Sequence, residues 1–255
     1  MTRISNWKQN HDGVIVGGWG LLGPASAEVM SLSALDWVAL DAQHGSFDDR
    51  SALEALHAIP RERMDVLVRV PRNDEGRIGR VLDAGARGVI VPMVETEEDA
   101  RRAAQACRYP SQGTRSWGQV GSRWGRPEID VATSNAEVVC AVMVESRTGL
   151  DNVDAIAATP GIDMIFVGPF DLSIALGTTV HDLLAQGRNG ELGTIVAACE
   201  RHNVIAGAFA GTVERSERLA ELGFSALAAG TDEGMLAASS QALTGSLASE
   251  QVGSY

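Results

Sequence analysis

The chain has 255 residues, of which 45% are hydrophobic and 21% are charged, as in a globular protein with one substantial core. Its formal net charge of −12 argues against non-specific nucleic-acid binding, which needs a basic face. The apolar runs are too short to cross a bilayer, and residues 1–12 lack the apolar stretch of a signal peptide. We therefore expect a cytoplasmic protein with no membrane partner and no nucleic-acid partner.

Short apolar or β-branched runs alternate with alanine-rich helical patterns along the chain. The expected strands are Val14–Trp19, Trp37–Asp41, Val66–Val70, Gly88–Val91, Val138–Glu145, Met164–Val167, Val204–Ala208 and Ala226–Ala229. The expected helices are Ala25–Leu32, Asp48–Ala58, Glu75–Ala84, Glu97–Cys107, Leu150–Ala158, Gly190–His202 and Val213–Leu222. Thr96 and Thr212 are expected to cap the starts of two of these helices, and Gly85 and Gly223 to end two of them.

Eight strand-then-helix units with nearly continuous hydrophobic strands predict an α/β fold whose parallel sheet is buried on both faces. We expect the sheet to close into a single-domain (β/α)8 TIM barrel, for which about 250 residues are typical. The barrel core would run from about residue 14 to 236, followed by a tail over residues 237–255. An open doubly wound sheet is the alternative. No nucleotide cofactor is expected.

The segment 109–135 interrupts this alternation, because it is long and rich in glycine and arginine. A loop of this length is usually functional or part of an interface. Its arginines Arg115, Arg123 and Arg126 could close over an anionic substrate, lie in a subunit interface, or be solvated.

Cysteine and lysine usage limits the chemistry. Cys107, Cys140 and Cys199 are odd in number and widely spaced, which favours buried free thiols over a disulfide framework. Lys8 is the only lysine, and it precedes the first expected strand. Because a Schiff-base aldolase needs a lysine amine inside its site, we expect no Schiff-base lysine, and carbon-acid chemistry would need another electron sink.

Polar side chains fall at the carboxyl ends of four expected strands, where (β/α)8 barrels have their active sites. Asp41 and His44 follow the second strand, Arg69 ends the third, Glu145 ends the fifth and Asp171 follows the sixth. Each of these residues also has a simpler interpretation. The carboxylates could cap helices, the histidine could be an ordinary loop residue, and the arginine could be a structural partner for a carboxylate. Charged groups on barrel strands are nevertheless costly to bury unless they are paired or bind a metal.

The combination indicates a divalent-metal site that acts on a 2-oxo acid. Glu145 and Asp171 would leave room for water and substrate oxygens around Mg²⁺, Mn²⁺ or Co²⁺. The cation would act as a Lewis acid on the keto oxygen, and Arg69 would add charge-assisted hydrogen bonds. His44 is the expected proton carrier. Asp83, at the end of the third expected helix, could hold its imidazole.

Taken in order, several segments resemble motifs of the HpcH/HpaI aldolase family, which are class II pyruvate aldolases acting on 4-hydroxy-2-oxo acids and related sugar acids. The segments are Asp41-Ala42-Gln43-His44-Gly45, Val68-Arg69-Val70, Asn73-Asp74, Leu82-Asp83-Ala84-Gly85-Ala86, Val91-Pro92-Met93-Val94, Tyr109-Pro110, Gly113-Thr114-Arg115, Val144-Glu145 and Gly168-Pro169-Phe170-Asp171-Leu172-Ser173. The resemblance runs from about Val14 to Leu236 and covers nearly the whole expected barrel.

The resemblance implies that His44 is a base with Asp83 as its partner, that Arg69 stabilises an enolate, and that Glu145 and Asp171 bind the metal. The substrate-binding positions that it implies are Trp19, on the acceptor side, and Met143, Gly168, Pro169, Phe170 and Asp171. It also implies a homo-oligomer, a hexamer or trimer of dimers, in which the C-terminal helix packs on a neighbouring subunit.

Two residues depart from the family's pattern. Met143 stands where a glutamine is usual, so a hydrogen bond to the substrate is missing or replaced. Phe170 stands where alanine or serine is usual, and its bulk could narrow the pocket. We expect a metal-dependent aldolase that cleaves or forms 4-hydroxy-2-oxo acids through a pyruvate enolate and an aldehyde. The alternatives are a citrate-lyase-like CoA-thioester lyase on the same scaffold, or a weakly catalytic barrel that binds metal and ligand.

Overall fold

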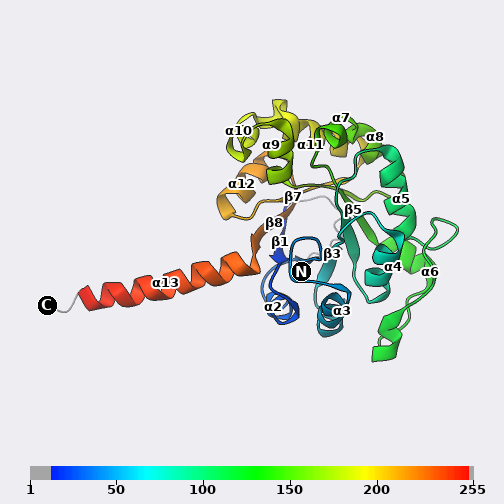
Figure 1. The fold of residues 1–255 in the computed structure, drawn as a ribbon, viewed down its shortest axis with the longest axis horizontal. Coiled ribbons are helices and arrows are strands. Elements are labelled where there is room, and N and C mark those ends of the chain that lie inside the picture. Colours follow the sequence, from blue (N-terminus) through cyan, green and yellow to red (C-terminus); the bar gives the residue numbers. More distant parts are fainter. Residues whose placement is uncertain (1–12, 253–255) are drawn as a thin grey trace.

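The computed structural model describes residues 13–252, and its centre is a closed barrel of eight parallel strands in chain order (Figure 1). The strands are β1 (Ile15–Gly20), β2 (Trp37–Asp41), β3 (Asp65–Arg69), β4 (Gly88–Val91), β5 (Val139–Met143), β6 (Met164–Val167), β7 (Ile205–Phe209) and β8 (Ala226–Thr231). The predicted (β/α)8 barrel is therefore confirmed, and the open doubly wound sheet is wrong. Lys8 and the last three residues of the tail lie outside the described residues.

Helices surround the barrel on its outside (Figure 1). They are α2 (Pro24–Met30), α3 (Asp49–Ala58), α4 (Glu75–Asp83), α5 (Glu97–Cys107), α6 (Val131–Glu137), α7 (Arg147–Asp151), α8 (Val153–Ala158), α9 (Pro169–Leu176), α10 (Val180–Ala185), α11 (Glu191–His202), α12 (Val213–Leu222) and α13 (Asp232–Val252), with the 3-10 helices η1 (Val120–Trp124) and η2 (Gly187–Asn189).

The expected elements differ from the observed ones mainly after β5 and β6. The expected strand Val138–Glu145 ends at Met143, which leaves Glu145 beyond the strand, on the rim of the barrel. The expected helix Leu150–Ala158 is divided into α7 and α8 at Asn152. The sequence patterns do not indicate α9 and α10, because helices of eight and six residues carry too little periodicity to be recognised.

Two apolar regions stabilise the barrel. One fills its interior with alternate strand residues, among them Trp37, Leu67, Ile90 and Phe166, and the other lies between the strands and the surrounding helices. Gly17 on β1 pairs with Trp37 on β2, and a Cβ at Gly17 would overlap the Trp37 ring. This glycine therefore makes room for one of the two tryptophans of the interior.

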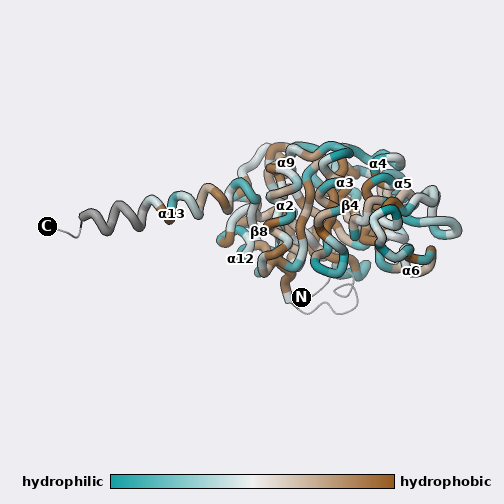
Figure 2. The backbone as a smooth tube through the Cα atoms, turned by 90° about the horizontal axis from the view of Figure 1, so that it is seen from below, coloured by the Kyte–Doolittle hydropathy of each residue, from teal (hydrophilic) through white to brown (hydrophobic). Residues whose placement is uncertain are grey.

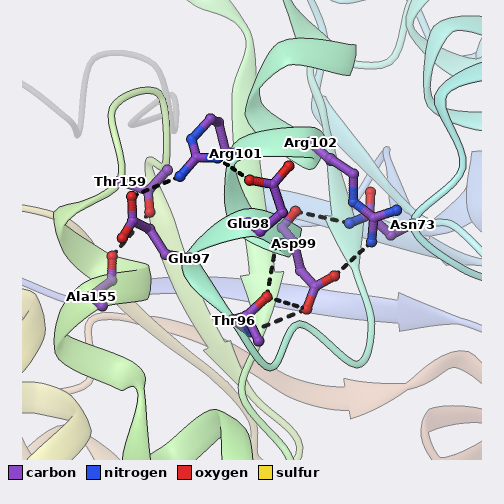
Figure 3. A network of polar contacts seen from close by, with 9 residues as sticks. All are labelled: Asn73, Thr96, Glu97, Glu98, Asp99, Arg101, Arg102, Ala155 and Thr159. Carbon is purple, nitrogen blue, oxygen red and sulfur yellow. Dashed lines mark hydrogen bonds and ion pairs between the residues drawn. The ribbon is translucent and has the colours of Figure 1, made fainter.

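The start of α5 shows how local sequence fixes a helix end, as Figure 3 shows. The Thr96 hydroxyl accepts a hydrogen bond from the Asp99 N–H at 3.1 Å, while the Asp99 carboxylate accepts from the Thr96 N–H, also at 3.1 Å. Asn73, beyond β3, donates to the Asp99 carbonyl at 2.9 Å. Such reciprocal caps satisfy N–H groups that have no partner within the helix. The expected caps at Thr96 and Thr212 are both confirmed.

The last helix, α13, leaves the barrel after β8 and extends away from it (Figures 1 and 2). Leu236 and Leu243 on this helix are 63% and 66% exposed, so it presents apolar side chains without covering them against its own barrel. Across residues 13–252, no helix combines the length and the hydropathy that a bilayer span requires. The three cysteines are buried free thiols, as expected.

Candidate active site

A pocket of about 250 Å³ opens at the carboxyl ends of the strands and collects most of the expected site residues. Its lining consists of Trp19, Leu21, Asp41, His44, Arg69, Met143, Gly168, Phe170, Asp171, Phe209 and Thr231. Glu145 adjoins the pocket through Gly168. The fold therefore brings residues from seven strands or the loops that follow them to one place.

Asp41 is a fully buried residue of the pocket lining. Its register partner on β3 is Arg69, whose Nε donates to Asp41 Oδ1 at 2.9 Å and whose Nη2 donates to Asp41 Oδ2. Trp19 Nε1 also donates to Oδ2, at 3.1 Å, and the Trp19 ring lies 5.1 Å from the guanidinium carbon of Arg69. Asp41 thus fixes the orientation of both the arginine and the indole.

The same carboxylate fixes the loop that carries His44. The His44 N–H donates to Asp41 Oδ1 at 3.1 Å, and the imidazole is exposed at the mouth of the pocket. Burial by itself raises the pKa of Asp41, but the hydrogen bonds and charge of Arg69, with the His44 N–H and Trp19, outweigh burial and hold that pKa below its ordinary value of 3.8. Asp41 is therefore an anionic anchor at neutral pH.

Glu145 and Asp171 point toward a common position beside Gly168. A Cβ at Gly168 would stand 3.2 Å from Glu145 Oε2 and 3.3 Å from Asp171 Oδ2, so only glycine leaves this space free. The other oxygen of Glu145, Oε1, accepts the N–H of Met93 at 2.8 Å. Met93 has a φ of 53°, a left-handed conformation that is uncommon for a residue with a side chain. Its backbone thereby orients Glu145.

The electrostatics of this position fit a cation. Burial raises the pKa of Glu145 above its ordinary value of 4.5, and the Asp171 charge raises it further, although the Met93 N–H, Arg69 and His44 oppose the rise. A divalent ion between the two carboxylates would stabilise the ionised form of Glu145. Within residues 13–252, no three His, Cys, Asp or Glu side chains gather as a metal site. A cation here would take its other ligands from water and substrate.

The two residues that depart from the family's pattern both lie in the pocket. Met143 ends β5, is buried, and its terminal methyl group is 3.3 Å from the point where a Gly168 Cβ would be. Phe170 lies in the first turn of α9 and is 44% exposed. Gly168 and Pro169 begin α9, which has no side-chain cap, so N–H groups of its first turn are not bound by a capping side chain.

The structure does not bring Asp83 to His44 within one chain. In a βα unit the helix runs back toward the start of the next strand, so the last residue of α4 lies at the end of the barrel opposite to the pocket. There Asp83 Oδ1 accepts a hydrogen bond from Arg115 Nη2 at 2.7 Å. Within its own chain Asp83 is therefore bound to Arg115, and the expected pairing with the imidazole is not formed there.

The arginine-rich segment lies at that same opposite end. Arg126 Nη2 donates to the carbonyls of Leu56, at 2.8 Å, and His57, at 2.7 Å, where α3 ends. Arg115 pairs with Asp83, as described, and Arg123 belongs to the exposed part of η1. The idea that these arginines close over the substrate of the same chain is therefore not supported, and an interface or a solvated surface remains.

Four contributors to the site were not predicted from the sequence. Leu21, Phe209 and Thr231 line the pocket, and Met93 orients Glu145 through its N–H. Phe209 and Thr231 end β7 and β8, so strand position alone indicates them. Asp232 contributes indirectly. Its carboxylate accepts hydrogen bonds from the N–H groups of Leu21, at 2.9 Å, and Leu22, at 3.0 Å, and so fixes the loop after β1.

Comparison with known proteins gives concordant matches over nearly the whole chain. A model of the HpcH/HpaI aldolase/citrate lyase family matches residues 20–239. The hydroxypyruvate/pyruvate aldolase of Deinococcus radiodurans is 38% identical, over 91% of this chain and 84% of that protein. The 5-keto-4-deoxy-D-glucarate aldolase of Klebsiella pneumoniae is 36% identical, over 90% and 91%. A solved HpcH/HpaI aldolase/citrate lyase family protein from Burkholderia cenocepacia superposes with a TM-score of 0.83 at 30% identity, over 96% and 98%.

Proposed function

The chain belongs to the HpcH/HpaI aldolase/citrate lyase family, and from that premise we propose that it is a class II, divalent-metal-dependent aldolase that interconverts 4-hydroxy-2-oxo acids with pyruvate and an aldehyde. The observation that carries the proposal is the convergence of Glu145 and Asp171 beside Gly168, with Arg69 and His44 on the same pocket. Cleaving the C3–C4 bond of such an acid needs an electron sink at the keto oxygen and a base for the 4-hydroxyl.

Glu145 and Asp171 would hold the divalent cation, and their oxygens suit Mg²⁺, Mn²⁺ or Co²⁺. When bound, the ion supplies a Lewis acid at the keto oxygen of the substrate. The N–H groups in the first turn of α9, together with Gly168 and Pro169, would face the substrate carboxylate. Trp19 would border the acceptor side of the pocket, where its indole is fixed by Asp41.

Arg69 and His44 would carry out the remaining steps. Arg69 uses Nε and Nη2 to bind Asp41, which leaves its Nη1 donors for the keto oxygen as negative charge develops there. In cleavage, the 4-hydroxyl proton moves to an imidazole nitrogen of His44 as the C3–C4 bond breaks and its electron pair forms the enolate. The aldehyde leaves, and protonation of the enolate at C3 gives pyruvate.

Metal removal tests this function. We expect pyruvate release from 4-hydroxy-2-oxo acids to disappear after EDTA treatment and to return with Mg²⁺, Mn²⁺ or Co²⁺, measured by a coupled pyruvate assay. Exchange of the pyruvate methyl protons, followed by NMR, should show the same metal dependence. Release that persists without metal would contradict the proposal. Metal binding without either reaction would instead favour the thioester lyase or the weakly catalytic barrel.

A homo-oligomer, a hexamer or trimer of dimers, is proposed as well. The support is α13, which extends from the barrel (Figure 1). It exposes Leu236 and Leu243, two residues seven apart that share one helix face. Light scattering of the full chain should give about six times the chain mass, and Leu243→Glu should give a smaller species. A monomeric full chain would disprove the assembly. Thr244→Glu is the control for Leu243→Glu, because it adds the same charge to the helix.

A further inference from the structure

A second, larger hollow lies beside the active-site pocket. It has a volume of about 740 Å³ and is formed mainly by α10 and α12, with His181 on one side and Arg215 and Arg218 on the other. Phe170 lines both this groove and the active-site pocket. Because one exposed ring borders the two spaces, a ligand in the active site that extends past Phe170 enters the groove.

A row of aromatic rings connects the pocket with Arg215. The Trp19 and Phe209 ring centroids are 5.4 Å apart, and those of Phe209 and Phe170 are 6.5 Å apart. The guanidinium carbon of Arg215 then lies 5.1 Å from the Phe170 centroid. The row leads from the acceptor side of the pocket to Arg215 on α12.

Among the described residues the Arg215 guanidinium has no carboxylate partner, and its side-chain contact is with the Phe170 ring. The Arg215 backbone N–H donates to Thr212 Oγ1 at 3.2 Å. By contrast, Arg218 on the same helix binds Glu221 at 2.7 Å. A guanidinium that stacks on a ring uses its face, so its in-plane N–H donors stay available for a planar anionic group.

We propose that Arg215 determines substrate specificity by binding an anionic group, a carboxylate or a phosphate, at the far end of the acceptor aldehyde. This inference rests on the proposed aldolase function. Glu214, Glu217 and Glu221 also line the groove and repel an anion, whereas the guanidinium over Phe170 attracts one. An acceptor must therefore be long enough for its anionic end to pass the Phe170 ring.

The test compares matched pairs of aldehydes in the addition of pyruvate: succinic semialdehyde with butanal, and glyceraldehyde 3-phosphate with glyceraldehyde. The quantity measured is the ratio of kcat/KM for the anionic member to that for the neutral one. We expect the wild-type ratio to exceed one for at least one pair, and Arg215→Met to lower it about 10- to 100-fold, as for a lost charge-assisted hydrogen bond. Met keeps contact with the Phe170 ring, so the change reports the charge.

Arg218→Met is the matched control, since it removes an equal charge from the same groove, and it should leave the ratio within about twofold of wild type. Arg215→Lys should recover part of the ratio. The pair of aldehydes whose ratio responds shows whether the bound group is a carboxylate or a phosphate. A wild-type ratio at or below one for both pairs, or equal effects of Arg215→Met and Arg218→Met, would overturn the inference. Metal-dependent exchange of the pyruvate methyl protons needs no acceptor aldehyde. Its absence in the wild type would therefore refute the aldolase function itself, and this inference with it.

Discussion

Replacing Glu145 by glutamine is expected to lower kcat/KM for metal-dependent cleavage by about a thousandfold or more. Glutamine keeps the size of the side chain and an oxygen to accept the Met93 N–H, but it removes the charge that the cation requires. Lewis-acid stabilisation of the developing charge is worth several kcal/mol, and each 1.4 kcal/mol corresponds to about tenfold in rate. Steady-state kinetics with each metal at saturation would measure the loss.

Glu95→Gln provides the matched control for this variant. Glu95 is a rim carboxylate near Glu145, and its Oε1 accepts the Ser146 hydroxyl at 2.7 Å, a bond that an amide oxygen can also accept. We expect this variant to keep metal-dependent activity within a few-fold of wild type. Retained metal-dependent cleavage in Glu145→Gln, or equal losses in the two variants, would contradict the assignment of Glu145 as a ligand.

The metal-free form of Glu145→Gln has a second expected signature, in stability. The folded-state pKa of Glu145 lies above its ordinary value of 4.5, so the ionised side chain costs stability as pH rises through that folded value. Without metal, the variant should therefore unfold at a higher temperature than wild type at pH 7, and the difference should vanish below about pH 4.5. Added metal should raise the Tm of wild type and have little effect on the variant.

The strand ends could be predicted because parallel strands impose a common geometry. Asp41 and Arg69 end neighbouring strands, and the observed register pairs them directly, so their contact follows from strand order. The sequence placed Asp41 among catalytic candidates. The structure shows it as the anchor of Arg69, Trp19 and the His44 N–H, a role that depends on side-chain directions and not on strand position.

Within one chain Asp83 lies away from His44, and the cause is topological. Its motif lies at the end of a helix, and helices return to the end of the barrel where strands begin. Strand and helix order alone would have placed it away from His44 in the same chain. Met93 could not have been found in this way, because its contribution is a backbone N–H in a left-handed conformation, which side-chain chemistry does not reveal.

Replacing Arg69 by methionine is expected to impair both folding and catalysis. Asp41 would remain buried with its ion partner removed, which typically costs about 3–5 kcal/mol of unfolding free energy. The enolate would also lose a charge-assisted donor, so we expect kcat/KM to fall by about 10²- to 10³-fold. Urea unfolding and steady-state kinetics measure the two losses, and the double variant Asp41→Asn with Arg69→Met should recover stability without recovering activity.

Arg87 offers a control because its ion pair is equally buried but lies where the strands begin. Its Nε donates to Asp65 at 2.8 Å, and the Arg87 and Asp65 side chains are 3% and 0% exposed. Arg87→Met should therefore destabilise the fold to a similar extent while kcat/KM of the folded enzyme stays within a few-fold of wild type. Because both variants lose a buried arginine, only a contact of Arg69 with the reacting atoms explains a difference in kcat/KM between them. Equal kinetic losses would mean that Arg69 acts through the fold alone.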